Sequence, residues 1–229
     1  MDRNSQSVKK RRRYDSTRRQ EQARQTREAI LAAARRRFLH HGYAATTIAA
    51  IAGDAGVSVD TIYKTFGGKP GLVREICSDG LAGKGAVHAE VRSDALQLHA
   101  TDPLQVMRGI GELAAEVAPR VAPILLLVRD AAAIDPDMAA LKAELDDKRL
   151  ERMTHNARNL ADAGHLRPGL SIDVAGEIMW TYSSPELYEL LIIRRGWSKQ
   201  RYGAFTAAAL AAALLPAERL PQPTTKQRK

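Results

Sequence analysis

The clearest pattern of apolar and polar residues lies in residues 47–66, TIAAIAGDAGVSVDTIYKTF. Apolar residues at helical spacing predict a first short helix there: Ile48, Ile51, Ala52 and Ala55. Gly56 follows, where a helix end favours a left-handed backbone. Ser58 can then cap a second short helix, whose inner face carries Ile62 and Phe66. The pattern therefore predicts two short helices joined by a tight turn.

The spacing within this segment is that of a DNA-binding helix-turn-helix. Gly56 lies four residues after Ala52, and Ile62 lies ten residues after it. In that motif a small residue stands where the helices cross, a glycine makes the turn and an aliphatic residue anchors the second helix. An ordinary αα-hairpin inside a helical bundle could carry the same residues. The flanking sequence has to decide between the two.

Helical patterns continue along the rest of the chain, without the alternation that is typical of strands. A long helix is predicted from about Arg18 to His40, closed by Gly42, and another from Lys69 towards Ala89. Five more are predicted at residues 103–118, 124–134, 136–163, 171–194 and 199–215, with Pro119 and Pro123 as breaks and Pro185 as a bend. The sequence thus predicts an all-α fold, with an N-terminal three-helix domain joined to a C-terminal helical domain.

These elements divide the chain into four parts. Residues 1–17 are interpreted as a disordered basic arm, and residues 18–84 as the helix-turn-helix domain with its motif at 47–66. Residues 85–216 form the C-terminal helical domain, and residues 217–229 a polar tail. The KKRRR run at 9–13 could follow a DNA backbone or enter a minor groove, although a solvated tail explains it equally well.

The charge distribution favours a nucleic-acid partner for the N-terminal third. Residues 1–70 contain 15 Lys and Arg against 6 Asp and Glu, a balance of +9. Residues 71–229 contain 20 of each and are neutral, so the first third carries the whole formal charge of the chain. A solvated tail explains the basic run alone. An electrostatic footprint for phosphate also explains why the rest of the chain is neutral.

Composition argues against several other classes of protein. Cys77 is the only cysteine, which rules out an intramolecular disulfide and fits a reducing cytoplasm. No uncharged segment reaches the length of a membrane span, and the basic N-terminus lacks the apolar stretch of a signal peptide. No catalytic or cofactor motif is present, and the adjacent His40 and His41 face different sides of a helix. We therefore expect a cytoplasmic protein that is not an enzyme and has no metal, cofactor or membrane partner.

A larger set of residues at fixed spacing resembles one family. These residues are Ile30, Leu31, Ala34, Phe38, Gly42, Tyr43, Thr47, Ile51, Ala52, Ala55, Gly56, Val57, Ser58, Thr61, Ile62, Tyr63, Phe66, Lys69 and Leu72. Residues 24–84 resemble the DNA-binding domain of TetR-family (tetracycline-repressor-like) transcriptional regulators. Residues 183–215 more weakly resemble the last two helices of some members. The resemblance implies a helical ligand-binding and dimerisation domain after the DNA-binding domain.

The matching residues can be given roles on DNA that also have a physical basis. Thr47 stands at a helix N-terminus, where its backbone N–H and hydroxyl can donate to phosphate. The candidate DNA-binding residues are Thr47, Ser58, Val59, Asp60, Thr61, Tyr63, Lys64 and Lys69. Ser58 could instead be only a cap, Tyr63 partly core, and the two lysines solvated surface. Val59, Asp60 and Thr65 depart from the commonest family pattern, so these positions are expected to influence operator preference.

The resemblance also implies partners. We expect a homodimer through the helices at 171–194 and 198–215, a near-palindromic double-stranded DNA operator and release by a small-molecule effector. The alanine-rich last helix could instead pack inside one subunit. The candidate ligand-binding residues are Met107, Leu126, Arg129, Met153, His155, Trp180 and Tyr182, each of which is also interpretable as core. Arg129 needs a charged partner, from Asp130 or from a neighbouring helix. A ligand-responsive activator and a helical nucleic-acid-binding adaptor without a ligand are the alternatives.

Overall fold

The computed structural model describes residues 3–82, 87–99 and 102–220, and every regular element in these ranges is a helix. The all-α fold class is therefore confirmed. The chain forms two compact units, Met1–Ile76 and Cys77–Lys229, which meet within the helix α4 (Lys69–Ala82). The sequence predicted this boundary after residue 84.

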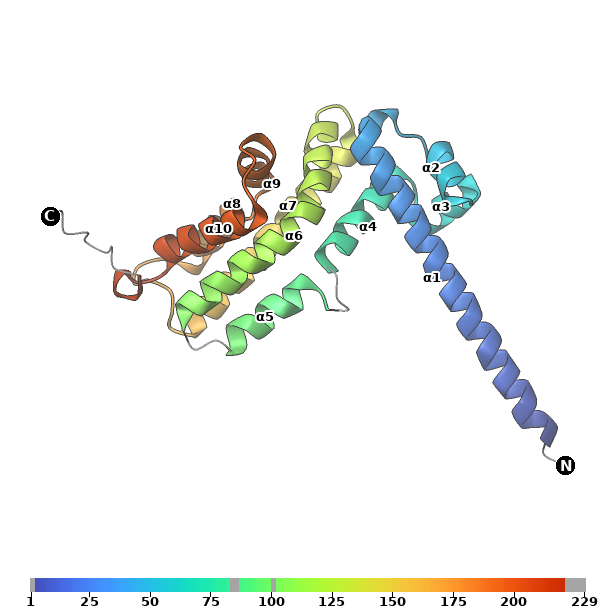
Figure 1. The fold of residues 1–229 in the computed structure, drawn as a ribbon, viewed down its shortest axis with the longest axis horizontal. Coiled ribbons are helices and arrows are strands. Elements are labelled where there is room, and N and C mark those ends of the chain that lie inside the picture. Colours follow the sequence, from blue (N-terminus) through green and yellow to red (C-terminus); the bar gives the residue numbers. More distant parts are fainter. Residues whose placement is uncertain (1–2, 83–86, 100–101, 221–229) are drawn as a thin grey trace. The chain divides into compact units, whose positions relative to one another are not determined.

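The first unit contains α1 (Arg3–Ala45), α2 (Ile48–Ala55), α3 (Val59–Phe66) and the start of α4. In Figure 1, α2 and α3 lie beside the C-terminal half of α1. Apolar residues from all four helices form the core: Ile30, Ala34, Phe38, Ile51, Ile62, Phe66, Leu72 and Val73. These are the inner faces predicted from helical spacing, so the apolar pattern determines which side of each helix is buried.

The helix α1 begins earlier than the sequence indicated. Its backbone is helical from Arg3, where the sequence predicted a disordered arm as far as residue 17. The first forty residues contain no glycine or proline and are rich in Arg, Lys, Gln and Glu, all of which favour helix. At the other end Gly42 interrupts the helix with φ +79°, as predicted, and the Tyr43 ring stacks on Phe38 at 5.8 Å.

The second unit begins with the end of α4 and contains most of the helices. They are α5 (Ala89–His99), α6 (Pro103–Ala132), α7 (Pro136–Asp162), α8 (Ile172–Tyr182), α9 (Pro185–Tyr188), a π-helix η1 (Glu189–Arg194), α10 (Lys199–Leu214) and a short 3₁₀-helix η2 (Ala217–Arg219). The α5 helix was not predicted. Of the predicted tail, residues 221–229 lie outside the described range.

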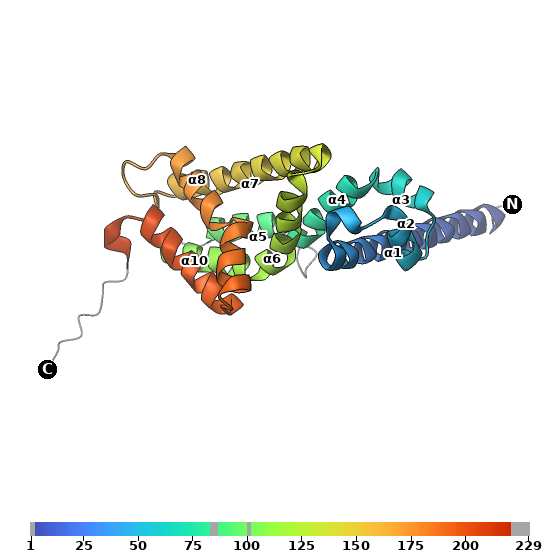
Figure 2. The same ribbon diagram turned by 90° about the horizontal axis from the view of Figure 1, so that it is seen from above.

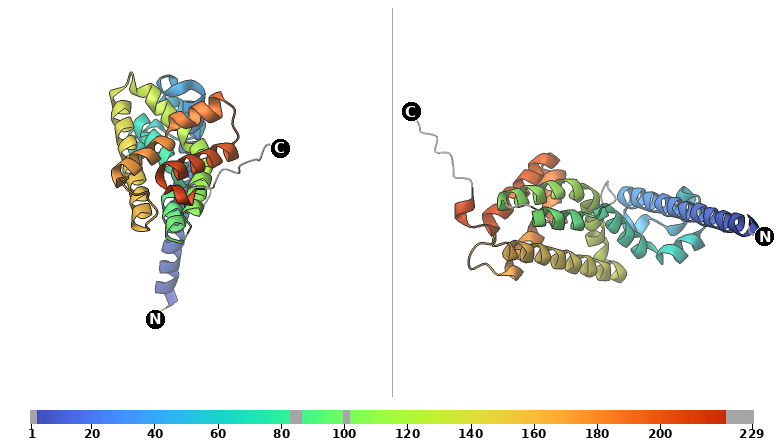
Figure 3. Two further views of the ribbon diagram at one scale, coloured as in Figure 1. Left: turned by 90° about the vertical axis from the view of Figure 1, so that its left-hand side faces the viewer. Right: turned by 90° about the horizontal axis from the view of Figure 1, so that it is seen from below.

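The predicted break at Pro119 and Pro123 is wrong. Both prolines lie inside the single helix α6, which changes direction along its length (Figures 2 and 3). Each proline removes one backbone donor and bends a helix without necessarily ending it. Buried residues continue at helical spacing across both prolines: Val121, Ala122, Ile124, Leu126 and Val128. Their packing outweighs the two missing hydrogen bonds.

The predicted single helix over residues 171–194 is also wrong. The chain leaves the helix after Tyr182 and starts α9 at Pro185, with the Ser184 hydroxyl accepting a hydrogen bond from the Leu187 N–H at 3.2 Å. A serine cap followed by proline at the first helical position favours the start of a new helix. This local signal determines the structure here, although the apolar periodicity continues through residues 183–185.

Two glycines allow close packing of α6 against α10. A Cβ on Gly203 would lie 2.6 Å from the backbone oxygen of Gly111, and one on Gly111 would lie 2.3 Å from the oxygen of Gly203. The two backbones therefore approach more closely than any other residue type permits. On the same side of α10, Ala207 and Ala211 are buried inside the unit.

Candidate DNA-binding surface and ligand cavity

The short helices α2 and α3 each begin with a hydroxyl cap, and the cap of α3 is Ser58, as the sequence predicted. The Thr47 hydroxyl accepts a hydrogen bond from the Ala50 N–H at 3.1 Å, and the Ser58 hydroxyl accepts one from the Thr61 N–H at 3.1 Å. Gly56, at φ +66°, ends α2 and donates its N–H to the Ala52 carbonyl. These local bonds set the angle between the two helices of the motif.

One side of α3 is available to a partner. Ile62 and Phe66 are buried, which turns Val59, Tyr63 and Lys64 outward together with Asp60. The Tyr63 side chain is 54% exposed. Because residues at i and i+4 share a helix face, Val59 stacks above Tyr63 and Asp60 above Lys64. This exposed face combines apolar, acidic, phenolic and basic groups within two helical turns.

The other candidate DNA-binding residues are partly engaged within the domain. The Ser58 and Thr61 hydroxyls lie 2.9 Å apart and hydrogen-bond to each other. The Lys69 ammonium donates to the Tyr43 carbonyl at 2.9 Å and lies 4.2 Å from the centre of the Tyr43 ring. An ammonium has three donors, so Lys69 is held in place and keeps the capacity to bind a further acceptor. Thr47 is exposed at the start of α2.

Two ion pairs join the helices of this unit. Arg37 on α1 donates two hydrogen bonds of 2.7 Å each to the carboxylate of Asp54 on α2. This hydrogen bonding holds the pKa of Asp54 below its usual value. Arg27 on α1 pairs with Glu75 on α4, and its guanidinium lies 5.1 Å from the centre of the Phe66 ring. Arg27 therefore connects α1 with both α3 and α4.

The second unit contains a cavity of about 300 Å³. Its wall is mainly apolar and includes Ile110, Leu113, Val117, Leu125, Leu145, Met153, Met179, Tyr182, Tyr202 and Leu210. The polar residues on the wall are Glu90, Ser93, Lys148, Arg149, Arg152, Asn156, Ser183, Ser184 and Thr206. A volume of this size lies at the lower end of the range for sites that bind small organic ligands.

Only some of the predicted ligand-binding residues line the cavity. Met153 and Tyr182 line the cavity. Met107 and Leu126 are buried in the core away from its wall. His155 lies 3.2 Å from Asp94, and Trp180 stacks under the Arg149 guanidinium at 4.3 Å, so both lie outside the cavity lining.

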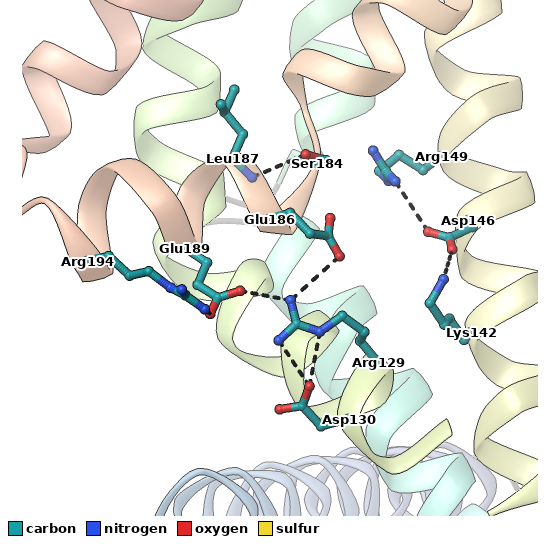
Figure 4. Close-up of polar contacts among 10 residues, drawn as sticks. All are labelled: Arg129, Asp130, Lys142, Asp146, Arg149, Ser184, Glu186, Leu187, Glu189 and Arg194. Atoms are coloured by element: carbon teal, nitrogen blue, oxygen red, sulfur yellow. Dashed lines mark hydrogen bonds and ion pairs between the residues drawn. The ribbon is translucent and has the colours of Figure 1, made fainter. Parts of the chain in front are cut away.

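Arg129 finds the partners that it was expected to need. Its guanidinium donates to Glu189 of η1 at 2.8 Å and to Asp130 at 3.0 Å, with Glu186 at 3.9 Å (Figure 4). Arg194 donates to the same Glu189 at 2.7 Å. Hydrogen bonds from Arg129 and Arg194 hold the pKa of Glu189 below its usual value. Arg129 therefore joins α6 to the π-helix rather than facing the cavity.

Two buried polar side chains are among the cavity residues that were not predicted from the sequence. Asn156 is 3% exposed and Thr206 is 1% exposed, and both line the cavity. A signal for Asn156 was present, because it lies three residues after Met153 and four before Leu160, on the apolar side of α7. A polar residue at an inward position of a helix is a candidate binding group. Thr206 gave no such signal among the alanines around it.

Parts of α8 and α10 expose apolar side chains. Val174 is 45% and Phe205 37% exposed. Phe205 contacts the rings of Trp197 at 5.5 Å and Tyr182 at 6.4 Å. Ala204, Ala208 and Ala212 are also exposed, on the side of α10 opposite the buried Ala207.

Two other kinds of site are absent from the described ranges. None of the helices described is both long and apolar enough to cross a membrane. No cluster of three or more His, Cys, Asp and Glu side chains suited to a metal ion occurs among the described residues.

The N-terminal segment is similar to a known protein family. Residues 30–76 match the model of the family described as bacterial regulatory proteins, tetR family. No curated protein sequence matches the chain. The resemblance of the N-terminal domain to this family, which the sequence predicted, is confirmed over residues 30–76.

Solved structures share the fold over most of the chain. A complex of SmeT with triclosan is 21% identical, with a TM-score of 0.66 over 88% of this chain and 99% of that one. SmeT is the repressor of the Stenotrophomonas maltophilia multidrug efflux pump SmeDEF. NalD, the secondary repressor of a Pseudomonas aeruginosa efflux pump, is 19% identical, with a TM-score of 0.65 over 86% and 99%. FadR, a fatty acid degradation regulator from Bacillus halodurans, is 16% identical, with a TM-score of 0.66 over 81% and 94%.

Proposed function

We propose that this protein is a homodimeric repressor that binds a near-palindromic operator through α3 and is released by a small molecule. The observation that carries the proposal is the exposed face of α3, in a domain that holds the whole formal charge of the chain. A helix-turn-helix places the N-terminal part of its second helix against base edges in the major groove. Such a regulator works in the bacterial cytoplasm, where its operator is.

Some residues of α3 would contact bases and others would contact phosphates. Val59 offers methyl groups to a thymine methyl, and Asp60 can accept from a cytosine amino group. Tyr63 and Lys64, one turn later, reach phosphate and groove. Ser58 and Thr61 would contribute through the hydrogen-bonded pair that their hydroxyls form.

Phosphate contacts would flank the recognition helix. Thr47, at the N-terminus of α2, would donate its hydroxyl and nearby backbone N–H groups to one phosphate. Lys69 would contact a second phosphate through the ammonium hydrogens that do not bond to the Tyr43 carbonyl. The basic run at 9–13 has two interpretations, a DNA contact and a solvated tail, and its side chains lie outside those that the structure describes.

A dimer would bring two copies of α3 to one operator. The exposed apolar residues of α8 and α10, with Val174 and Phe205 the largest, support an interface built by these two helices. The exposed Ala204, Ala208 and Ala212 would let the helices of two subunits approach closely. Half-sites should then lie about one DNA turn, ~34 Å, apart.

Release by a ligand is supported by the cavity of about 300 Å³ in the second unit. Two proteins of similar fold are named as repressors of multidrug efflux pumps, and one of them was solved with triclosan. These names favour repression over activation for this chain as well, and they favour a small organic effector.

Selection of bound fragments from genomic DNA by the purified protein tests the proposal. We expect enrichment of a near-palindromic sequence, bound at least tenfold more weakly by Tyr63→Ala or Lys64→Ala, because each variant removes a side chain that reaches base or phosphate. Lys142→Ala is the matched control, since Lys142 lies on α7 in the second unit and outside the cavity lining. Enrichment of no sequence, or equal affinity of all three variants, would refute the DNA-binding role of α3.

A further inference from the structure

The two arginines on the cavity wall are already neutralised and held by the protein. Arg152 donates to both oxygens of Asp94, at 2.6 and 3.2 Å, and to the Glu90 carbonyl at 3.2 Å. Arg149 pairs with Asp146 at 3.2 Å and donates to the Trp180 carbonyl at 2.6 Å. An acidic ligand would therefore have to break an existing ion pair to find a cation.

The remaining charges on the wall face solvent. Lys148 pairs with Glu144 at 2.7 Å and has a side chain that is 63% exposed. Glu90 is the only carboxylate among the described residues that line the cavity, and it is exposed. The buried part of the wall therefore offers no uncompensated charge to a ligand ion. Transfer of an ion from water into such a site costs far more than transfer of a neutral molecule.

Asn156 presents a hydrogen-bond donor on this wall. Its Oδ1 accepts from Arg152 at 2.7 Å, from Gln97 at 3.0 Å and from the Ser93 hydroxyl at 3.3 Å. Three donors around one atom fix that atom as the oxygen and its neighbour as the amide nitrogen. The nitrogen has one contact among the described residues, to the Met153 sulfur at 4.0 Å, and a thioether is a weak acceptor.

Thr206 adds a second polar group on α10. Its hydroxyl oxygen is buried and has no hydrogen-bond partner within the described part of the chain. The Tyr202 phenol lies one turn before it, and burial raises the pKa of Tyr202 to about 12. The Thr206 hydroxyl lies near the Tyr202 phenol and opposes that rise. Thr206 can therefore donate to or accept from a ligand.

We propose that the cavity binds an uncharged, mainly apolar molecule whose polar oxygen accepts a hydrogen bond from the Asn156 amide nitrogen. Thr206 provides a second polar contact for a ligand that reaches α10. A cavity of about 300 Å³ suits a compact molecule of roughly two fused rings. This assignment rests on the proposed function in treating the cavity as the effector site, but it concerns ligand binding alone.

Four naphthalene derivatives of nearly equal size test the ligand class on purified full-length protein without DNA. They are 2-acetonaphthone with a neutral acceptor, 2-ethylnaphthalene with no polar group, 2-naphthoate with a negative charge and 2-naphthylmethylammonium with a positive charge. Titration calorimetry measures each dissociation constant. We expect the ketone to bind about tenfold more tightly than the hydrocarbon, and the two ions to bind at least tenfold more weakly than the ketone.

The Asn156→Asp variant tests the donor. It keeps the oxygen that holds Arg152 and Gln97 and replaces the amide N–H donor with an acceptor. We expect the ketone to lose its advantage over the hydrocarbon, while hydrocarbon affinity stays within twofold and reports an intact cavity. Asn159→Asp is the matched control, because Asn159 lies on the same helix outside the cavity lining and should bind all four compounds like the wild type.

Three results would overturn the assignment. They are tightest binding by either ion, an unchanged ketone-to-hydrocarbon ratio in Asn156→Asp, and binding of none of the four compounds. Operator affinity of the same preparations is measured separately by fluorescence anisotropy. Loss of operator binding with the expected ligand pattern would refute the proposed repressor and leave the ligand class standing. Operator binding together with one of the three contrary ligand results would refute the ligand class and leave the proposed repressor standing.

Discussion

The guanidinium of Arg37 and the carboxylate of Asp54 meet through two parallel hydrogen bonds of 2.7 Å each, and so fasten α2 to α1. Bidentate pairs of this kind fix orientation as well as distance. Since α2 carries the turn into α3, the pair helps to set the direction in which the exposed face of α3 points. Its pH dependence is a direct test of that link.

We expect Asp54→Asn to lower the melting temperature slightly at pH 7 and less as the solution becomes acidic. The folded-state pKa of Asp54 lies below its unfolded value, so the pair stabilises the domain above about pH 4. The stabilisation is lost as the pH falls through the folded-state pKa. Calorimetric melting of both proteins between pH 7 and pH 3 measures the gap, with Arg37→Gln as the reciprocal variant. A gap that stays constant to pH 3 would rule out this contribution.

The crossing of α6 and α10 should tolerate no side chain at Gly203. An added methyl group at this position would lie 2.6 Å from the Gly111 oxygen, and overpacking of this kind costs about 1–3 kcal/mol. Gly53→Ala is the matched control, because a Cβ there meets nothing within 4 Å and should stabilise α2 by ~0.5–1 kcal/mol. Urea unfolding of both variants gives the two free energies. Equal effects would show that the close approach is not needed.

Glu189 should contribute more than Glu186 to the stability of the π-helix η1. Glu189 accepts from Arg129 at 2.8 Å and from Arg194 at 2.7 Å, whereas Glu186 lies 3.9 Å from Arg129. We expect Glu189→Gln to lower the melting temperature more than Glu186→Gln, with the difference shrinking in 1 M salt because surface pairs are screened. The opposite order in low salt would mean that the cluster in Figure 4 does not hold η1 in place.

A substitution at Ala208 should disrupt the proposed dimer without unfolding the subunit. This residue is exposed on α10, so Ala208→Glu leaves the subunit core intact while placing a charge in the proposed interface. Sedimentation velocity should show a monomer for this variant and a dimer for the wild type. Ala140→Glu, at an exposed position of α7, should remain a dimer. A dimeric Ala208→Glu would exclude this face of α10.

Features that depend on nearby residues could be predicted from the sequence. The cap Ser58 was recognised because a hydroxyl followed by a helical pattern is a local signal, and this hydroxyl accepts the expected backbone hydrogen bond. Gly42 and Gly56 were recognised because a glycine directly after a helical pattern favours a helix end, and both have a positive φ in the structure. The family resemblance rests on the same short-range spacing.

Features that depend on packing between distant helices could not be predicted. Pro119 and Pro123 remain inside α6 because residues on either side of them are buried by other helices, which the local sequence does not specify. The cavity combines residues from all the α-helices from α4 to α10, so its lining depends on how these helices pack together. Periodicity placed Met107 and Leu126 correctly inward, but an inward position does not distinguish solid core from cavity wall.

The salt dependence of operator affinity tests the central claim, DNA binding through α3, most directly. Fluorescence anisotropy with a selected operator fragment gives the binding constant of wild type and Lys64→Ala between 50 and 200 mM KCl. We expect log K to fall linearly with log salt, and the slope for Lys64→Ala to be shallower by about 1 for each phosphate that the variant no longer binds. A flat salt dependence of the wild type, or an identical slope for Lys64→Ala, would contradict the account.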